Sequence, residues 1–181
     1  ARVPLIIHAP DRFTPQRVAT PVSLIDLLPT FVDWASEDQA ITYAASIDGR
    51  SLTPLLRGEA GSEDNFVASE YLAEIAQGPC LMLRRGEYNY ISSEPDSELL
   101  FNLATDPREL SNLAARPEDS DILQRFRAEA ARRWNISDLR AQVIASQRRR
   151  RLVGQSLMKG KITTWDFQPT TDASQQYIRN T

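Results

Sequence analysis

Few side chains in this sequence combine the type and the spacing that catalysis requires. The chain has one histidine, His8, and one cysteine, Cys80. A single histidine excludes a multi-histidine metal site or a two-histidine relay within these residues, and a single thiol excludes an internal disulfide. Because a lone thiol suits a reducing compartment, we expect a cytoplasmic protein.

The surroundings of both residues indicate structural roles. Cys80 begins the apolar stretch "CLMLR", which is typical of a strand, and we expect a buried thiol. His8 closes the apolar run "VPLIIHAP" (3–10), and no metal-ligating residue stands at a useful spacing from it. By its sequence alone, Glu70 belongs on the solvent face of an edge strand, and Tyr71 beside it belongs in the core.

The charge pattern argues against nucleic acid and membrane as partners. Arg148 to Arg151 form a basic run, but four consecutive helical residues point all round the helix, and the net charge is -3. We therefore expect surface or intersubunit ion pairs from these arginines. No apolar run approaches the roughly 18 residues needed to span a bilayer.

The secondary structure that follows from the sequence is mixed. Continuous apolarity at 3–10 predicts a buried strand, and 20–35 predicts a helix with Thr20 as its cap, Pro21 at its first position and a kink at Pro29. A turn and a short helix capped by Ser51 follow. The later elements are four antiparallel strands and two helices, expected at 66–73, 79–86, 88–92, 99–103, 117–134 and 137–159.

The stretch "LLFNLATDPRELSNLA" (99–114) ends its strand abruptly, because a central strand cannot continue through Pro107. We expect Asp106 to cap the turn and Glu109 to complete a capping-box-like arrangement. The stretch resembles the late L-Y-D-L-x-x-D-P-x-E-x-x-N-L motif of sulfatases in the alkaline phosphatase superfamily. Phe101 and Asn102 replace the usual Tyr and Asp.

Further segments are similar to the same family in the same order. They are "ARVPLIIHAP", "VATPVSLIDLLPTFVDWA" and "DGRSLTPLLRG". The resemblance to choline sulfatases in particular rests on "SEYLAE", "GPCLMLRRGEYNYI", "SQRRRRLVGQSL", "WDFQP" and "YIRN". It covers nearly the whole chain.

The resemblance implies an α/β fold of the alkaline-phosphatase type in three parts. Residues 1–60 would end a large α/β domain with a strand and a helix. Residues 61–134 would form a small α+β domain, in which a four-stranded antiparallel sheet packs with a helix. Residues 135–181 would form a helical extension and a tail, with Trp165, Phe167 and Tyr177 as anchors.

The resemblance also implies hydrolysis of a sulfate monoester, with choline sulfate as the small-molecule substrate. The family nucleophile is a formylglycine made from the Cys of C-x-P-x-R, and a divalent cation, usually Ca²⁺, completes the site. Cys80 and Arg84 have that spacing, but Met82 stands where Pro or Ala is required. We therefore expect no catalytic residue, metal or cofactor in this chain.

The partners implied are an N-terminal catalytic domain, since the family's catalytic motifs precede the strand with which this chain opens, and further copies in a homo-oligomer. In choline sulfatases the segment that holds Glu70 borders the pocket for the trimethylammonium group. Such a cation is held by aromatic faces and carboxylates. The resemblance thus implies substrate-binding roles for Glu70 and Tyr71.

Two other interpretations remain open at the level of the sequence. One is a related arylsulfatase or phosphonate monoester hydrolase. The other is a stand-alone interaction module without an active site.

Overall fold

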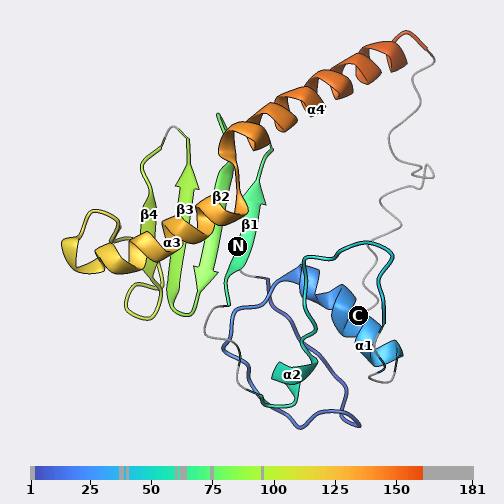
Figure 1. The fold of residues 1–181 in the computed structure, drawn as a ribbon, viewed down its shortest axis with the longest axis vertical. Helices are drawn as coiled ribbons and strands as arrows, with labels where there is room; N and C mark the ends of the chain where they lie inside the picture. The colour runs from blue at the N-terminus through green and yellow to red at the C-terminus, as the bar shows by residue number, and fades with distance from the viewer. Residues whose placement is uncertain are drawn as a thin grey trace, which may run out of the picture. The chain divides into compact units, whose positions relative to one another are not determined.

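The computed structural model describes residues 3–36, 39, 41–59, 61, 65–73, 76–94 and 96–160. The chain divides into two compact units, Ala1–Ile136 and Ser137–Thr181. The first unit contains a four-stranded sheet and several helices, and the second contains nearly all of helix α4 (Figure 1).

The sheet consists of strands β1 (Val67–Tyr71), β2 (Cys80–Arg85), β3 (Tyr88–Ser93) and β4 (Leu99–Asn102), in that order. All three pairs are antiparallel, as the sequence predicted. Gly86 has a φ of 51° in the two-residue turn between β2 and β3, a conformation that favours glycine in tight hairpins.

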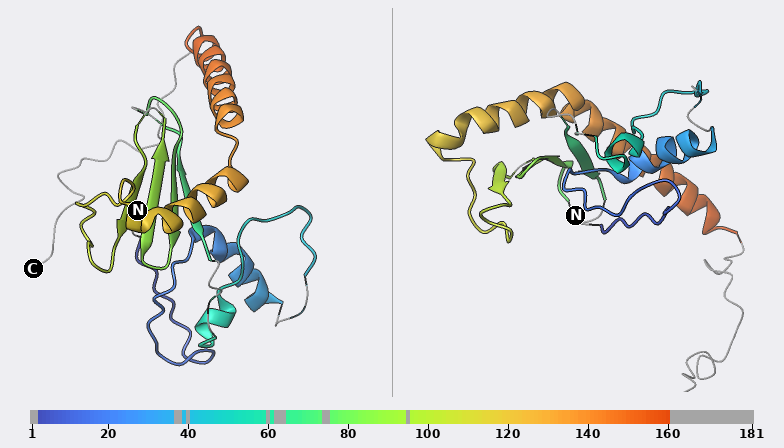
Figure 2. Two further views of the ribbon diagram at one scale, coloured as in Figure 1. Left: turned by 60° about the vertical axis from the view of Figure 1, so that its left-hand side comes forward. Right: turned by 90° about the horizontal axis from the view of Figure 1, so that it is seen from below.

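Helix α3 (Ser120–Arg133) lies across one face of this sheet and follows the short 3₁₀ helix η2 (Pro117–Asp119) (Figure 2). The buried core between them consists of Leu83, Tyr90, Leu100, Leu123 and Phe126. On the helix side, Ile122, Ala130 and Trp134 pack against the same cluster, at the four-residue spacing that they share with Phe126. The small α+β arrangement predicted from the sequence is therefore confirmed.

The Asp-Pro corner after β4 is held by side chains that replace backbone partners. Asn112 Oδ1 accepts hydrogen bonds from the amides of Leu100 and Ala114, both 3.0 Å long, and its Nδ2 donates to the carbonyl of Glu98 at 3.0 Å. Asp106 Oδ2 accepts from the amide of Ser111 at 2.8 Å, which confirms its role in the turn. The corner closes the outer edge of β4.

Glu109 does not complete a capping box with Asp106, so that expectation was wrong. Its carboxylate instead accepts a hydrogen bond of 2.6 Å from Asn89 Nδ2 on β3. The backbone of Glu109 has a φ of 56°, in the left-handed region that residues other than glycine rarely adopt. Residues 107–116 form turns and irregular backbone rather than the start of a helix.

Helix α1 (Leu27–Ala35) begins later than the sequence indicated. The 3₁₀ helix η1 (Leu24–Asp26) precedes it, and Ser23 and Asp26 form a capping box. That box determines where the helical backbone starts, so the prediction of a start at Thr20 and Pro21 was wrong. Pro29 lies in the first turn of α1, where its missing N–H costs no intrahelical bond.

The buried side of α1 is polar and holds the loop that follows. Asp26 Oδ1 accepts from the amide of Arg50 at 3.1 Å, and Thr30 Oγ1 accepts from the amide of Leu52 at 2.8 Å. Thr30 also donates to the carbonyl of Asp26 at 2.6 Å. The two neighbouring sequence motifs that indicated the family are thus joined by side-chain to main-chain bonds.

The loop passes very close to η1 on its way to the short helix α2 (Thr53–Leu56). A Cβ atom at Gly49 would lie 2.1 Å from the carbonyl oxygen of Ile25, so only glycine fits there. Ser51 Oγ accepts a hydrogen bond of 3.1 Å from the amide of Thr53, but the N-cap of α2 is Leu52, so the prediction that Ser51 caps this helix was wrong by one residue.

The other side of α1 is apolar and exposed. We call this surface the α1 apolar face. It consists of Leu24 and Ile25 of η1 and Leu28 and Phe31 of α1, each 55–57% exposed. Within the described residues no element covers this face.

Residues 3–10 do not form the buried strand expected from their apolarity. They are irregular, with Val3 62% and Ile6 89% exposed, and His8 is exposed as well. The prediction was wrong because a strand needs a neighbour for its amides, and no described strand lies beside this segment.

Helix α4 (Ile136–Leu157) matches the predicted helix, although Ser137 lies inside its first turn rather than before it. None of its residues is buried. The expected anchors Trp165, Phe167 and Tyr177 fall outside the described residues.

Candidate functional site

The Glu70 carboxylate is exposed on strand β1, at an edge of the sheet. It shares a strand face with Ala68, which packs against the core under α3. Glu70 Oε1 accepts a hydrogen bond of 2.6 Å from the indole Nε1 of Trp134. The carboxylate is therefore fixed next to the C-terminal end of α3 rather than free in solvent.

Trp134 supplies this bond from a well-anchored position. It caps the C-terminus of α3, where its amide donates to the carbonyl of Ala130 at 2.9 Å, and its ring packs against the core cluster. The pair presents a negative charge beside an aromatic ring. That combination attracts cations, including those that lack hydrogen-bond donors.

Tyr71 does not share this face. Consecutive strand residues point to opposite sides of a sheet, so Tyr71 lies on the side away from α3, where it is 51% exposed. The expected core position of its ring is therefore wrong. The structure does not bring Glu70 and Tyr71 together on one surface.

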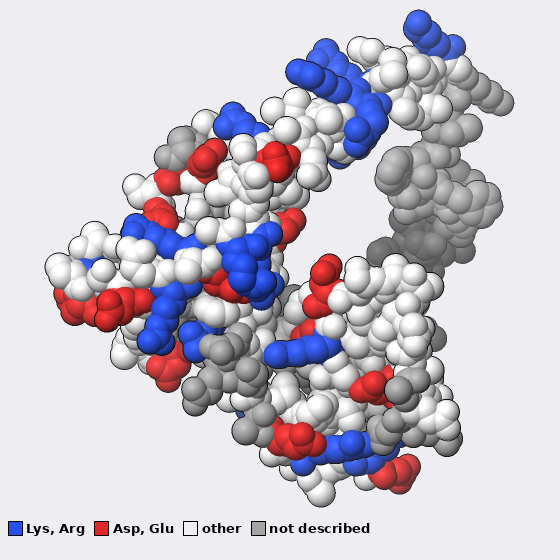
Figure 3. All heavy atoms as spheres, viewed as in Figure 1, with Lys and Arg blue, Asp and Glu red and all other residues white. Residues whose placement is uncertain are grey.

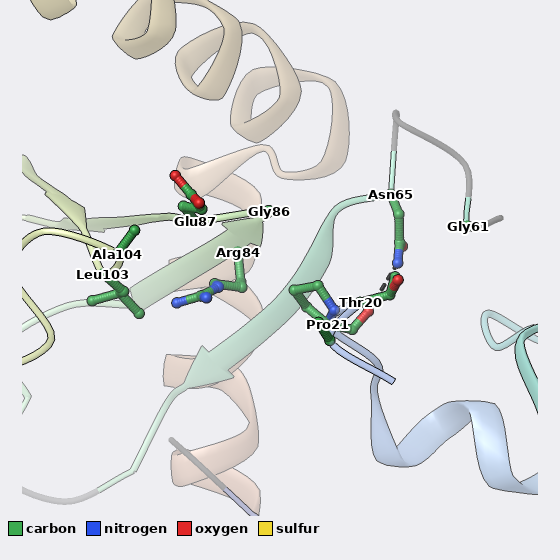
Figure 4. A pocket seen from close by; sticks show the side chains of 10 residues that line it. Thr20, Pro21, Gly61, Asn65, Arg84, Gly86, Glu87, Leu103 and Ala104 are labelled. Atoms are coloured by element: carbon green, nitrogen blue, oxygen red, sulfur yellow. Dashed lines mark hydrogen bonds between the residues drawn. The ribbon is translucent and has the colours of Figure 1, made fainter. Parts of the chain in front are cut away.

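A separate pocket of about 510 Å³ opens near the β2–β3 turn (Figure 4). Its charged lining residues are Arg84 and Glu87, of opposite sign, and Asn65 donates a hydrogen bond of 2.8 Å to the carbonyl of Pro21 at its rim. Neither Glu70 nor Tyr71 lines this pocket. The opposed charges define no single ligand chemistry.

Cys80 begins strand β2 as a free thiol and is half-buried, less than expected. It is paired with Tyr71 and Ser93 within the sheet and does not stand at the start of a helix. Among the described residues, no three His, Cys, Asp or Glu side chains gather closely enough to hold a metal ion. The chain's described residues thus do not fit the Ca²⁺ or formylglycine centre that the resemblance implies elsewhere.

Basic side chains gather along part of α4 in the second unit (Figure 3). Arg148 to Arg151 are all exposed there and follow one another round the helix, as expected from the sequence. No helix in the described part of the chain is both long and apolar enough to cross a membrane.

Sequence reasoning missed the partnership of Glu70 and Trp134. The four-residue spacing of Ile122, Phe126, Ala130 and Trp134 indicates a core position for the Trp134 ring, but it gives no partner for the indole N–H. The two residues are 64 positions apart, and no local pattern links them.

Comparison with known proteins agrees with the motifs. Residues 1–135 match the family model described as "N-sulphoglucosamine sulphohydrolase, C-terminal", and residues 141–181 match "Choline sulfatase enzyme C terminal". The chain therefore belongs to the sulfatase family and corresponds to the C-terminal part of its members. The expected family is confirmed.

Individual relatives have different activities. The chain is 38% identical to a choline-sulfatase of Rhizobium meliloti (strain 1021) over 99% of its length, and it spans 35% of that relative. It is 32% identical to arylsulfatase K of Gallus gallus over 70% of its length, and spans 25% of that protein. A solved 2-O GAG sulfatase superimposes with a TM-score of 0.48 at 34% identity, covering 68% of this chain and 25% of that one.

Proposed function

We propose that this chain is the C-terminal part of an enzyme that hydrolyses choline sulfate to choline and sulfate. The observation that carries the proposal is the succession of a sulphohydrolase C-terminal match at 1–135 and a choline-sulfatase C-terminal match at 141–181. The 38% identity to a choline-sulfatase extends through both regions and supports it. The arylsulfatase similarity, at 32%, keeps an aryl sulfate as the alternative substrate.

The sulfuryl-transfer chemistry is assigned to a preceding catalytic domain, with its formylglycine and its divalent cation. The described residues of this chain include no set of ligands for such a centre, so we derive no chemical step through them. We propose instead that residues of this chain bind the leaving group of the substrate and form contacts between subunits. We place the whole protein in the cytoplasm.

Glu70 is proposed to face the trimethylammonium group of choline. Its carboxylate is exposed, anchored and next to an indole ring. At an effective dielectric of about 20 and a separation of about 5 Å, one carboxylate attracts a cation by roughly 3 kcal/mol. Solvent screening reduces this to about 1–2 kcal/mol. Tyr71 lies on the other face of the sheet, so its ring would contact the trimethylammonium group only if that group reached past the edge of strand β1.

The test is Glu70→Gln in the full-length enzyme, which keeps the side-chain shape and removes the charge. Catalytic efficiency on choline sulfate should fall by about tenfold, while that on an aryl sulfate with an uncharged leaving group stays within about twofold. Glu87→Gln is the matched control, because Glu87 is an exposed carboxylate that lines the other pocket. Equal losses on both substrates, or a selective loss in the control instead, would contradict the assignment.

The 181-residue chain by itself should show no sulfatase activity. Purified chain incubated with choline sulfate and an aryl sulfate in the presence of Ca²⁺ should release sulfate no faster than buffer does. Turnover above that level would place the catalytic centre in this chain. The alternative is a stand-alone interaction module. An in-frame C-x-P-x-R motif in the coding sequence upstream of this chain would decide in favour of the enzyme.

The helical extension is proposed to mediate homo-oligomer contacts. Helix α4 has no buried residue within the described chain, yet it has large apolar side chains such as Leu152, Val153 and Leu157, which are 56–69% exposed. A full-length enzyme truncated after residue 135 should have a smaller oligomeric mass by light scattering than the intact enzyme. An unchanged mass would remove this role.

A further inference from the structure

We propose that Trp134 is a positioning residue for substrate selection, because it holds the Glu70 carboxylate in place through its indole N–H. The inference rests on the proposed role of Glu70. It adds a second residue from a different element, the C-terminal cap of α3, to the recognition of the cationic leaving group.

An exposed glutamate on an edge strand is ordinarily a mobile side chain. Ordering such a side chain costs conformational entropy each time a ligand binds. The bond of 2.6 Å from Trp134 Nε1 to Glu70 Oε1 restricts the carboxylate before any ligand arrives. A hydrogen bond to an ionised acceptor is stronger than one between neutral groups, so it can resist that entropy.

The donor is itself immobilised. The Trp134 ring packs against the core cluster that includes Phe126 and Leu123, and its backbone is fixed by the bond to Ala130. The Glu70 position is thus defined by the core of the sheet rather than by its own strand. The bond occupies Oε1, and no hydrogen bond from a described residue to Oε2 accompanies it.

An indole donor also preserves the charge that recognition needs. A lysine or arginine in the same place would neutralise Glu70 and compete with the substrate cation, whereas the indole is neutral. The arrangement orients a carboxylate without cancelling it.

The decisive experiment is a double-mutant cycle in the full-length enzyme with Trp134→Phe, Glu70→Gln and both together. Phenylalanine keeps an aromatic ring in the core and removes the N–H. We expect Trp134→Phe to raise the KM for choline sulfate about fivefold, because the carboxylate remains but is no longer held in place, with kcat unchanged and no selective effect on an uncharged aryl sulfate. In the Glu70→Gln background, Trp134→Phe should have no further selective effect.

Trp34→Phe is the matched control, because Trp34 Nε1 also donates to a side chain, the Thr53 hydroxyl at 3.2 Å. This substitution should change both substrates equally. Trp134→His, which retains a ring N–H, should recover part of the loss. The same pattern in Trp134→Phe and Trp34→Phe would reduce Trp134 to a structural residue and overturn the inference.

The outcomes separate the inference from the function on which it rests. If Glu70→Gln shows no selective loss, the proposed role of Glu70 fails and the inference fails with it. If Glu70→Gln is selective but Trp134→Phe is not, only the inference fails.

A measurement that leaves Trp134 in place covers the case in which Trp134→Phe does not fold. The chain has three indoles, at Trp34, Trp134 and Trp165. In ¹H–¹⁵N spectra of the 181-residue chain, recorded at a concentration at which it remains dispersed, Glu70→Gln should move the Trp134 indole proton upfield, because its acceptor loses the charge, and leave the other two unchanged. An unmoved Trp134 resonance would overturn the inference.

Discussion

The phenol of Tyr90 donates a hydrogen bond of 2.5 Å to Oε1 of Glu98 and so joins the centre of β3 to the residue just before β4. Arg127 on α3 binds the same carboxylate through two of its nitrogens. Burial raises the pKa of Tyr90 to about 12, and the bond to Glu98 acts in the same direction. The hydrogen bonds from Arg127 hold the pKa of Glu98 below its usual range.

The Tyr90 pKa predicts an alkaline loss of stability. A tyrosine ionises near 10 in the unfolded chain and near 12 in the fold, so between these values the folded state binds more protons. The free energy of unfolding should therefore be fully supported by Tyr90 below pH 10 and should fall as pH rises from about 10 to about 12. Chemical denaturation of Tyr90→Phe should show a shallower decline over that window. An identical slope in the two proteins would contradict the assignment.

How much of this fold the sequence predicts depends on how local the determining contacts are. The hairpin around Gly86 and helix α3 depend on contacts between residues close in the sequence, and both occur where the sequence predicted them. The start of α1 was missed because a capping box at Ser23 and Asp26 outweighs a favourable proline at Pro21.

The candidate site was less predictable for the same reason. Glu70 could be singled out by resemblance, but its partner lies on another element, and only the register of β1 under α3 brings them together. The apolar segment 3–10 failed as a strand because apolarity indicates burial without supplying the neighbour that a strand requires.

The Asn112 side chain should be a major determinant of stability in the sheet unit. Asn112→Ala removes three hydrogen bonds and leaves the amides of Leu100 and Ala114 without their acceptor, so we expect a loss of about 2–3 kcal/mol. Asn112→Asp keeps the acceptor and should lose less. Ser111→Ala is the control, because Ser111 contributes its backbone amide to the corner. If denaturant unfolding gives Asn112→Ala the same free energy of unfolding as the control, the corner tolerates the loss of the Asn112 side chain and the prediction is wrong.

Gly49→Ala should disrupt the contact between η1 and the loop before α2. The new Cβ would overlap the Ile25 carbonyl oxygen at 2.1 Å, which forces the backbone apart and weakens the Asp26 bond to Arg50. We expect a fall in melting temperature of several degrees, which corresponds to a loss of about 1–3 kcal/mol in the free energy of unfolding. Gly154→Ala, in α4 with no atom within 4 Å of its Cβ position, should cause no loss. Equal melting temperatures for the two variants would refute the steric argument.

The α1 apolar face should bind a hydrophobic dye and promote aggregation of the 181-residue chain. Leu24 and Leu28 are 57% and 56% exposed, whereas the equally exposed Phe31 makes an edge-on ring contact with Trp34. The double variant Leu24→Lys, Leu28→Lys should bind markedly less dye and remain dispersed at higher concentration. Gln124→Lys, at an exposed polar position of α3, controls for added charge. Unchanged dye binding in the double variant would locate the exposed apolar surface elsewhere.

Trp134 has a consequence for protein engineering through its position in the chain. The compact units meet between Ile136 and Ser137, and the two family matches end at 135 and begin at 141. A crossover placed at residues 136–140 would exchange the C-terminal module between sulfatases while the indole that holds Glu70 stays with its own sheet. Given the proposed roles of α4 in assembly and of Glu70 in leaving-group preference, chimeras built there should vary the two traits independently, whereas a crossover a few residues earlier should change both at once.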